Sequence, residues 1–198
     1  MTVIACAIVE GRAVMASDSS VSGDDVVALS NDKIFRSGET LVGVCGSLRF
    51  NDIAHRYRKY WCLDGAPSPL DKLRKLAAKL RKEFVPKDDE SFEYIVCTTR
   101  ALYLIDTTYA VIELSTSYHA IGSGALGALA VLRHQYNVGE MYSPDHAVCA
   151  VIPHHTDVKG PVRTIVVGGG ALQEPCANRQ KNSKKNGRKS SKRPASAT

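Results

Sequence analysis

The sequence predicts an α+β protein built as a four-layer αββα sandwich, in which two antiparallel sheets lie face to face between two layers of helices. Three observations predict this fold class. Segments with strand character come in two groups, two helical segments follow each group, and one last strand closes the order. The chain has 198 residues and is 44% hydrophobic. This is enough to bury one core, so we expect a single folded domain.

The first group of strands begins with a hairpin. Residues 2–9 and 12–17 are largely apolar on both faces, which suits strands buried between two layers, and Glu10-Gly11 joins them as a turn. Residues 26–29 and 41–45 continue the strand character. We expect all four segments to be strands of the sandwich.

Helices and strands then alternate in blocks. Residues 47–62 carry apolar side chains at helical spacing, and residues 69–84 form an amphipathic helix with a leucine stripe opposite lysine and arginine. Strands are expected at 92–98, 101–106 and 109–114, helices at 125–136 and 144–152, and a closing strand at 162–167.

The basic residues are unevenly distributed. The formal net charge is +6, but residues 178–198 hold eight basic residues and no acid, and the rest of the chain has 18 basic against 20 acidic residues. We therefore assign residues 1–170 to the folded domain and residues 171–198 to a basic tail, which we expect to be disordered because it has almost nothing to bury. We interpret the tail as a solubilising or docking segment; contact with nucleic acid through its phosphates is the alternative.

The composition argues against several classes of protein. No run approaches the roughly 18 apolar residues of a membrane span, and the start lacks the basic region of a signal peptide, so we expect a cytoplasmic protein without membrane contact. The six cysteines are scattered and include no C-x-x-C pair, so we expect neither a zinc site nor a disulfide framework. Since no nucleotide-binding motif is present, we expect no cofactor, and any ATP would be hydrolysed by a separate protein.

A candidate nucleophile stands at position 2. Thr2 directly follows Met1, and a small second residue permits removal of the initiator methionine. The threonine would then carry a free α-amine, whose reference pKa of about 7.7–8.0 suits it to act as the base for its own hydroxyl. Many proteins begin with Met-Thr, so ordinary N-terminal processing is the alternative, and the residues that accompany Thr2 carry the argument.

Four further residues are candidates for a site around Thr2. Asp18 ends the second expected strand, and Lys33 follows fifteen residues later. A lysine beside Thr2 would favour the neutral amine by charge repulsion, and the Asp18 carboxylate would orient that lysine. Gly43 lies among small residues, where its N–H can face a developing oxyanion. Ser123 precedes a helix and offers a hydroxyl. Each also has an ordinary interpretation, as a turn, surface, packing or capping residue.

Together these motifs resemble those of the proteasome β-subunit and HslV family. The resemblance covers about residues 2–169, and a methionine directly before the threonine is more similar to HslV. Five motifs match the family pattern in their order and spacing. They are the opening hairpin with Thr2, Asp18 at its end, Lys33 before Ile34-Phe35, the run Val42-Gly43-Val44-Cys45-Gly46, and the run Ala120-Ile121-Gly122-Ser123-Gly124.

The resemblance implies the fold of the N-terminal nucleophile (Ntn) hydrolases and a threonine-type endopeptidase. Thr2 would attack a peptide carbonyl, form an ester and be released by water, with its α-amine as the base. Asp18 and Lys33 would be the charged pair beside it, Gly43 the oxyanion-hole glycine, and Ser123 a hydrogen-bond partner near the amine. The implied partners are further copies of the chain in stacked rings, an ATP-dependent unfoldase, and protein or peptide substrates.

The sequence departs from the family pattern at two places. The interval between Asp18 and Lys33 is one residue shorter than the usual spacing, which a deletion within 22–29 would absorb. Family members also carry an Asp/Ser-bearing turn after the last helix. Here Asp157 is the candidate acid, and Lys159 or Gly160 stands where a serine is expected.

Two other functions stay open. One is a catalytically silent ring-forming or adaptor subunit, which the altered region 153–161 favours and which a retained Met1 would establish. The other is an Ntn amidase acting on small amides, because fold alone does not separate an amidase from a protease. Ring size, cleavage specificity, the identity of an unfoldase and the role of the tail are not specified by the sequence.

Overall fold

The computed structural model describes residues 2–19, 32–88, 90–155, 158 and 161–168. In chain order its strands are β1 Ile4–Val9, β2 Arg12–Ser17, β3 Ile34–Ser37, β4 Thr40–Gly46, β5 Phe92–Cys97, β6 Leu102–Ile105, β7 Val111–Leu114, β8 Tyr118–Ile121 and β9 Arg163–Val167. The helices are α1 Leu48–Arg56, α2 Pro69–Glu83, α3 Ala125–Asn137 and α4 Pro144–Val151, with short 3-10 helices over Arg58–Trp61 and Ile152–His154.

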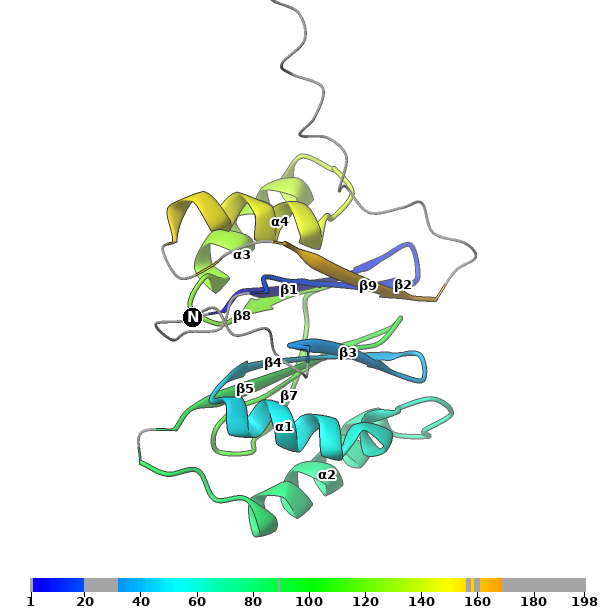
Figure 1. The fold of residues 1–198 in the computed structure, drawn as a ribbon. Helices are drawn as coiled ribbons and strands as arrows, with labels where there is room; N and C mark the ends of the chain where they lie inside the picture. The colour runs from blue at the N-terminus through cyan, green and yellow to red at the C-terminus, as the bar shows by residue number, and fades with distance from the viewer. Residues whose placement is uncertain (1, 20–31, 89, 156–157, 159–160, 169–198) are drawn as a thin grey trace, which may run out of the picture.

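The strands of the described residues form two sheets that lie face to face. One sheet has the order β8-β1-β2-β9 and the other the order β3-β4-β5-β6-β7, and every neighbouring pair is antiparallel. Figure 1 shows α3 and α4 outside the first sheet and α1 and α2 outside the second. The predicted αββα sandwich is therefore confirmed.

The opening hairpin forms as predicted. Val9 pairs with Arg12 across a two-residue turn, and both turn residues have positive φ, 51° at Glu10 and 71° at Gly11. This left-handed pair matches the twist of the flanking strands, and glycine adopts it without a steric penalty. The turn fixes the register of the whole hairpin and so determines which residue of β2 lies beside the start of β1.

The space between the sheets is filled by a core of buried apolar side chains. Ile4 and Met15 from the first sheet meet Ile34, Leu41 and Ile95 from the second, and all five are fully buried. Burial of such side chains contributes roughly 1.5–3 kcal/mol each. This inter-sheet core supports the strand ends around the start of the chain.

The two helical layers pack as amphipathic elements. Ser68 is the N-cap of helix α2, where its hydroxyl accepts from the N–H of Asp71, and the helix buries the predicted leucine stripe. On the opposite side, α3 and α4 cover Val3 and Ala16 through Ala128 and Val148. Helix α4 ends at Val151, and the 3-10 helix that follows contains Pro153.

The structure differs from the prediction in a few elements. Strands β3 and β8 have no counterpart in the predicted element order, and the helix expected over 47–62 ends at Arg56, before a 3-10 turn. Strand β8 contains the polar pair Tyr118-His119 and borders its sheet, so it lacks the apolar run of a central strand. The expected strand at 26–29 and the tail at 171–198 lie outside the described residues. No helix among the described residues is long and apolar enough to cross a membrane.

Candidate active site

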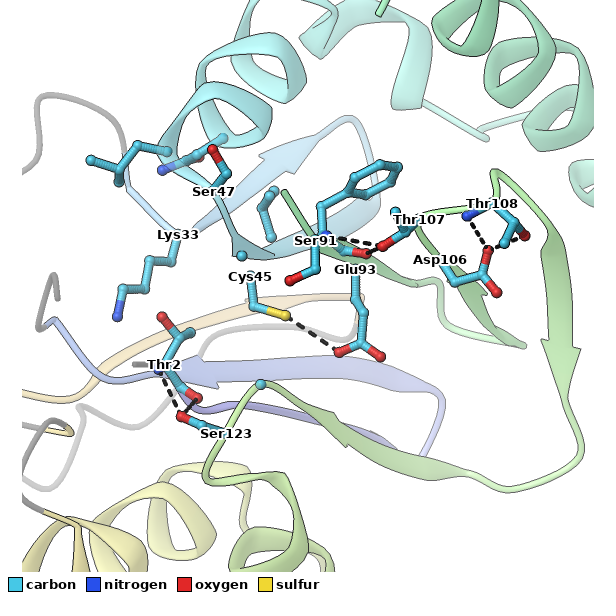
Figure 2. Close-up of a pocket in the computed structure, with 16 residues that line it drawn as sticks. Thr2, Lys33, Cys45, Ser47, Ser91, Glu93, Asp106, Thr107, Thr108 and Ser123 are labelled. Carbon is cyan, nitrogen blue, oxygen red and sulfur yellow. Dashed lines mark hydrogen bonds between the residues drawn. The ribbon is translucent and has the colours of Figure 1, made fainter. Parts of the chain in front are cut away.

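Thr2 lies against the turn between β8 and α3. Its backbone nitrogen is 3.2 Å from the Ser123 hydroxyl oxygen, and that hydroxyl is 3.3 Å from the Thr2 carbonyl oxygen. The N–H of Gly124 donates to the same carbonyl at 3.3 Å. The register of β1 and β8 explains why Thr2 lies beside Ser123. Ile4 pairs with Ile121, and each step back along β1 is matched by a step forward along β8. Figure 2 shows the resulting contact.

Gly122 permits this close approach. Its φ is +90°, and a Cβ built at this position would lie 2.3 Å from the Thr2 carbonyl oxygen. Any side chain would therefore push Thr2 away from the turn and would also strain the backbone. The glycine before Ser123 is thus a structural requirement of the site.

A buried ion pair lies beside Thr2. The Lys33 ammonium donates to the two carboxylate oxygens of Asp18 at 2.9 and 3.0 Å, and the side chains are 7% and 0% exposed. Asp18 also accepts from the N–H of Val3 at 2.9 Å, while its own N–H donates to the Val3 carbonyl. The hairpin register places these groups together, since Ile4 pairs with Ser17.

The pair places two opposite charges beside Thr2. Burial lowers the pKa of Lys33, and the charge and hydrogen bonds of Asp18 oppose that effect. Asp18 is thus a compensating anion and also an anchor for the first peptide group after Thr2.

A cavity of about 830 Å³ opens between the ends of the sheets at this point. Figure 2 shows Thr2 and Ser123 on one side and the ends of β4 and β5 on the other, with the Lys33 side chain reaching toward Thr2. The residues that line this cavity are Thr2, Lys33, Val44, Cys45, Gly46, Ser47, Leu48, Asn51, Ser91, Phe92, Glu93, Asp106, Thr107, Thr108, Gly122 and Ser123.

Gly43 occupies the interior of β4 and is not among the residues that line the cavity. It pairs with Ile34 on one side and Ile95 on the other. A Cβ at this position would lie 2.9 Å from the Cγ2 atoms of both Ile4 and Ile95. The lack of a side chain at Gly43 therefore permits close packing of the sheets. A role of the Gly43 N–H at the site stays a prediction.

Four of the six predicted site residues come together in the structure. Thr2, Lys33 and Ser123 line one cavity, and Asp18 is bound to Lys33. Asp157 lies outside the described residues. The described residue after it, Val158, is buried in the same cluster as Val3 and Ala16.

The cavity also contains residues that the sequence did not single out. The Cys45 thiol lies 3.4 Å from a carboxylate oxygen of Glu93, and burial, together with that charge, raises the pKa of the thiol. Asp106 and Thr107 belong to a turn at the other margin. A signal for Glu93 does exist in the sequence, because it is the one charged residue of the strand Phe92–Cys97.

No family model matches the chain, and no curated protein is similar to it in sequence. Among solved structures it is similar to Thiobacillus denitrificans BPH, with 23% identity and a TM-score of 0.66, over 84% of this chain and 97% of that chain. The same values apply to BPH in complex with epoxomicin, apart from 98% coverage of that chain. Eukaryotic HslV from Trypanosoma brucei has 18% identity and a TM-score of 0.65, over 83% and 98% of the two chains. These likenesses confirm the predicted HslV-type fold.

Proposed function

We propose that the chain is a threonine-type endopeptidase whose nucleophile is Thr2 after removal of Met1. The observation that carries the proposal is the contact of 3.2 Å between the Thr2 nitrogen and the Ser123 hydroxyl, in a cavity that Lys33 also lines. Removal of Met1 would turn that nitrogen into a free α-amine next to the threonine hydroxyl. One residue would then supply both nucleophile and base.

The proposed reaction has two stages. The α-amine takes the hydroxyl proton as Thr2 Oγ attacks a peptide carbonyl, and the resulting ester on Oγ is then hydrolysed by water. No metal or cofactor is needed, since nucleophile and base are supplied by the chain. Ser123 would hold the amine in place through the contact described above.

Lys33 and Asp18 would set the charge at Thr2. An ammonium group close to the α-amine disfavours protonation of that amine, which keeps the base available near neutral pH. Asp18 compensates the lysine and, through the N–H of Val3, fixes the peptide that follows Thr2. We further propose the Gly43 N–H as an oxyanion donor and Asp157 as an outer acid of the site. Replacement of the Gly43 amide by an ester, which removes its N–H, would test the first role, and the D157N variant would test the second.

We also propose that the chain assembles into rings of identical subunits. The support is the number of exposed large hydrophobic side chains carried by α3 and the residues just after it, which are Leu126, Tyr136, Val138 and Met141. These residues make up half of the exposed large hydrophobic side chains of the described part of the chain. Apolar surface of this kind favours association. A separate ATP-driven unfoldase would feed such a ring.

The proposal is tested by the intact mass of the purified protein before and after treatment with a peptide epoxyketone. Epoxomicin is a suitable probe because T. denitrificans BPH, which has the same fold, was solved in complex with it. We expect a species without Met1 that gains one inhibitor mass, and no adduct in Thr2→Ala. Retention of Met1 with no adduct would instead favour the catalytically silent subunit.

A second measurement separates protease from amidase. If the adduct forms, hydrolysis of an unfolded protein should be compared with hydrolysis of small acylated amides. Cleavage of the protein by a particle of ring mass supports the endopeptidase, whereas turnover of the small amides alone by a low oligomer supports the amidase.

A further inference from the structure

We propose that Glu93 makes the cavity selective for a cationic side chain, lysine or arginine, in the residue whose carbonyl Thr2 attacks. The inference rests on the proposed function, because it names the substrate class of that same site. It comes from the placement of one carboxylate, and the contacts of that carboxylate carry the argument.

Glu93 reaches the cavity from the second sheet. It lies on β5 directly across from Cys45 on β4, and Figure 2 shows both side chains pointing into the space that Thr2 and Ser123 border from the other side. All four residues line the same cavity of about 830 Å³. Pockets for small ligands have volumes of about 300–1,000 Å³, so a long side chain fits here.

The carboxylate of Glu93 has few partners. One of its oxygens accepts from the Cys45 thiol at 3.4 Å, and a thiol is a weak donor. Within the described residues, Glu93 forms no ion pair. A carboxylate offers about four acceptor positions, so most of its capacity faces the cavity.

The neighbouring acids differ from Glu93 in this respect. Asp106 closes its own turn by accepting from the N–H and hydroxyl of Thr108 and from the N–H of Ala110. Glu90 is paired with Arg49. The contacts of these two acids serve the protein itself, whereas Glu93 is left to meet a ligand.

The other charged or titratable groups of this space do not neutralise Glu93. Lys33 is bound to Asp18. His119 on β8 interacts electrostatically with Glu93, but burial lowers the pKa of the imidazole, which keeps it largely neutral at pH 7. Burial raises the pKa of the Cys45 thiol, so it stays neutral and does not change the charge at Glu93. The net field of this part of the cavity is negative.

This field selects among substrates. A guanidinium or ammonium that reaches Glu93 gains a charge-assisted hydrogen bond in a partly desolvated site, and a substrate carboxylate is repelled there. An apolar side chain fills the same volume but leaves the carboxylate without a cation. We therefore expect arginine and lysine to be preferred over leucine, and leucine over glutamate.

The test uses the mature protein and fluorogenic peptide amides that differ only in the residue before the cleaved bond, arginine, leucine or glutamate. We expect kcat/KM to be about tenfold higher for arginine than for leucine, which corresponds to roughly 1.4 kcal/mol. Glu93→Gln should lower the arginine-to-leucine ratio of kcat/KM to about one. Glu93→Lys should favour glutamate. Glu113→Gln is the matched control, because Glu113 is an exposed acid of β7 that does not line the cavity.

Two outcomes separate this inference from the proposed function. If the wild type cleaves the peptides but Glu93→Gln keeps the same preference, the endopeptidase stands and the selectivity assignment is overturned. If no peptide is cleaved, binding of n-propylguanidinium to the Thr2→Ala variant decides. Saturable binding that Glu93→Gln abolishes supports a cation pocket in a protein that is not a peptidase, and equal or absent binding in both variants overturns it.

Discussion

The Lys33 ammonium donates to both carboxylate oxygens of Asp18, and neither side chain is more than 7% exposed. A buried pair of this kind adds little stability as a whole, but removal of one partner leaves an uncompensated charge. The pair is therefore a sensitive point for the fold as well as for the proposed chemistry, and variants can separate the two roles.

Lys33→Met should unfold more easily than the wild type by about 3–5 kcal/mol, because Asp18 then carries a buried charge without its cation. Urea denaturation measures this loss. The double variant Asp18→Asn/Lys33→Met should regain much of the stability, since neither charge remains. Neither variant should form the epoxyketone adduct. An adduct in Lys33→Met at the wild-type rate would reduce Lys33 to a structural role.

Gly43→Ala should destabilise the sandwich by about 1–3 kcal/mol, because the added methyl overpacks the inter-sheet core. Its Cβ would lie 2.9 Å from the Cγ2 atoms of Ile4 and Ile95. In the double variant Gly43→Ala/Ile4→Ala the two changes should cost less than the sum of the single costs, since Ile4→Ala makes room for the methyl. Additive costs would show that the two positions are not in contact.

Leu126→Glu should lower the mass of the assembled particle. Leu126 is 84% exposed on α3, so the change adds a charge to the proposed contact surface without disturbing the core of the subunit. Sedimentation velocity gives the mass, and circular dichroism verifies the fold. Val85→Glu is the control, because Val85 is 70% exposed beyond the end of α2, in the opposite helical layer. Equal sedimentation of all three proteins would remove the α3 surface as an interface.

His119 should make the fold less stable in mild acid. Burial holds its pKa below the ordinary value, with the charge of Glu93 opposing. Below about pH 6.5 the unfolded chain therefore binds a proton at His119 more readily than the folded chain does. The free energy of unfolding should decrease as the pH is lowered through this window, and His119 should not change it at higher pH. The urea midpoint should drop less between pH 7.5 and pH 5.5 in His119→Gln than in the wild type. His134→Gln, at an exposed residue of α3, should behave like the wild type.

The part of the site on the first sheet could be predicted from the sequence because it follows from local geometry. A two-residue turn at Glu10-Gly11 fixes the hairpin register, and that register alone brings Asp18 beside Val3. Ser123 was recognised by the glycines around it. Lys33 is a candidate through its charge and through the family resemblance, since no local pattern links it to the hairpin.

The part on the second sheet could not be predicted in the same way. A charged residue in an apolar strand marks Glu93 as unusual, but its place in the cavity depends on its pairing with Cys45 and on the stacking of the two sheets. Such contacts join residues that are distant in sequence, and hydrophobic periodicity carries no information about them. Strand β8 is not predicted for a related reason. It borders its sheet and pairs with β1, which is distant in sequence, so its own residues lack the apolar run of a central strand.

The Thr2–Ser123 contact spans 121 positions of the chain. A ribosome delivers residues in order, so a growing polypeptide that ends before Ser123 has a threonine near its start but nothing to hold the nitrogen of that threonine. The contact between Thr2 and Ser123 can form only once β8 has docked on β1. For the proposed peptidase, the order of synthesis thus delays the assembly of the site until most of the fold exists.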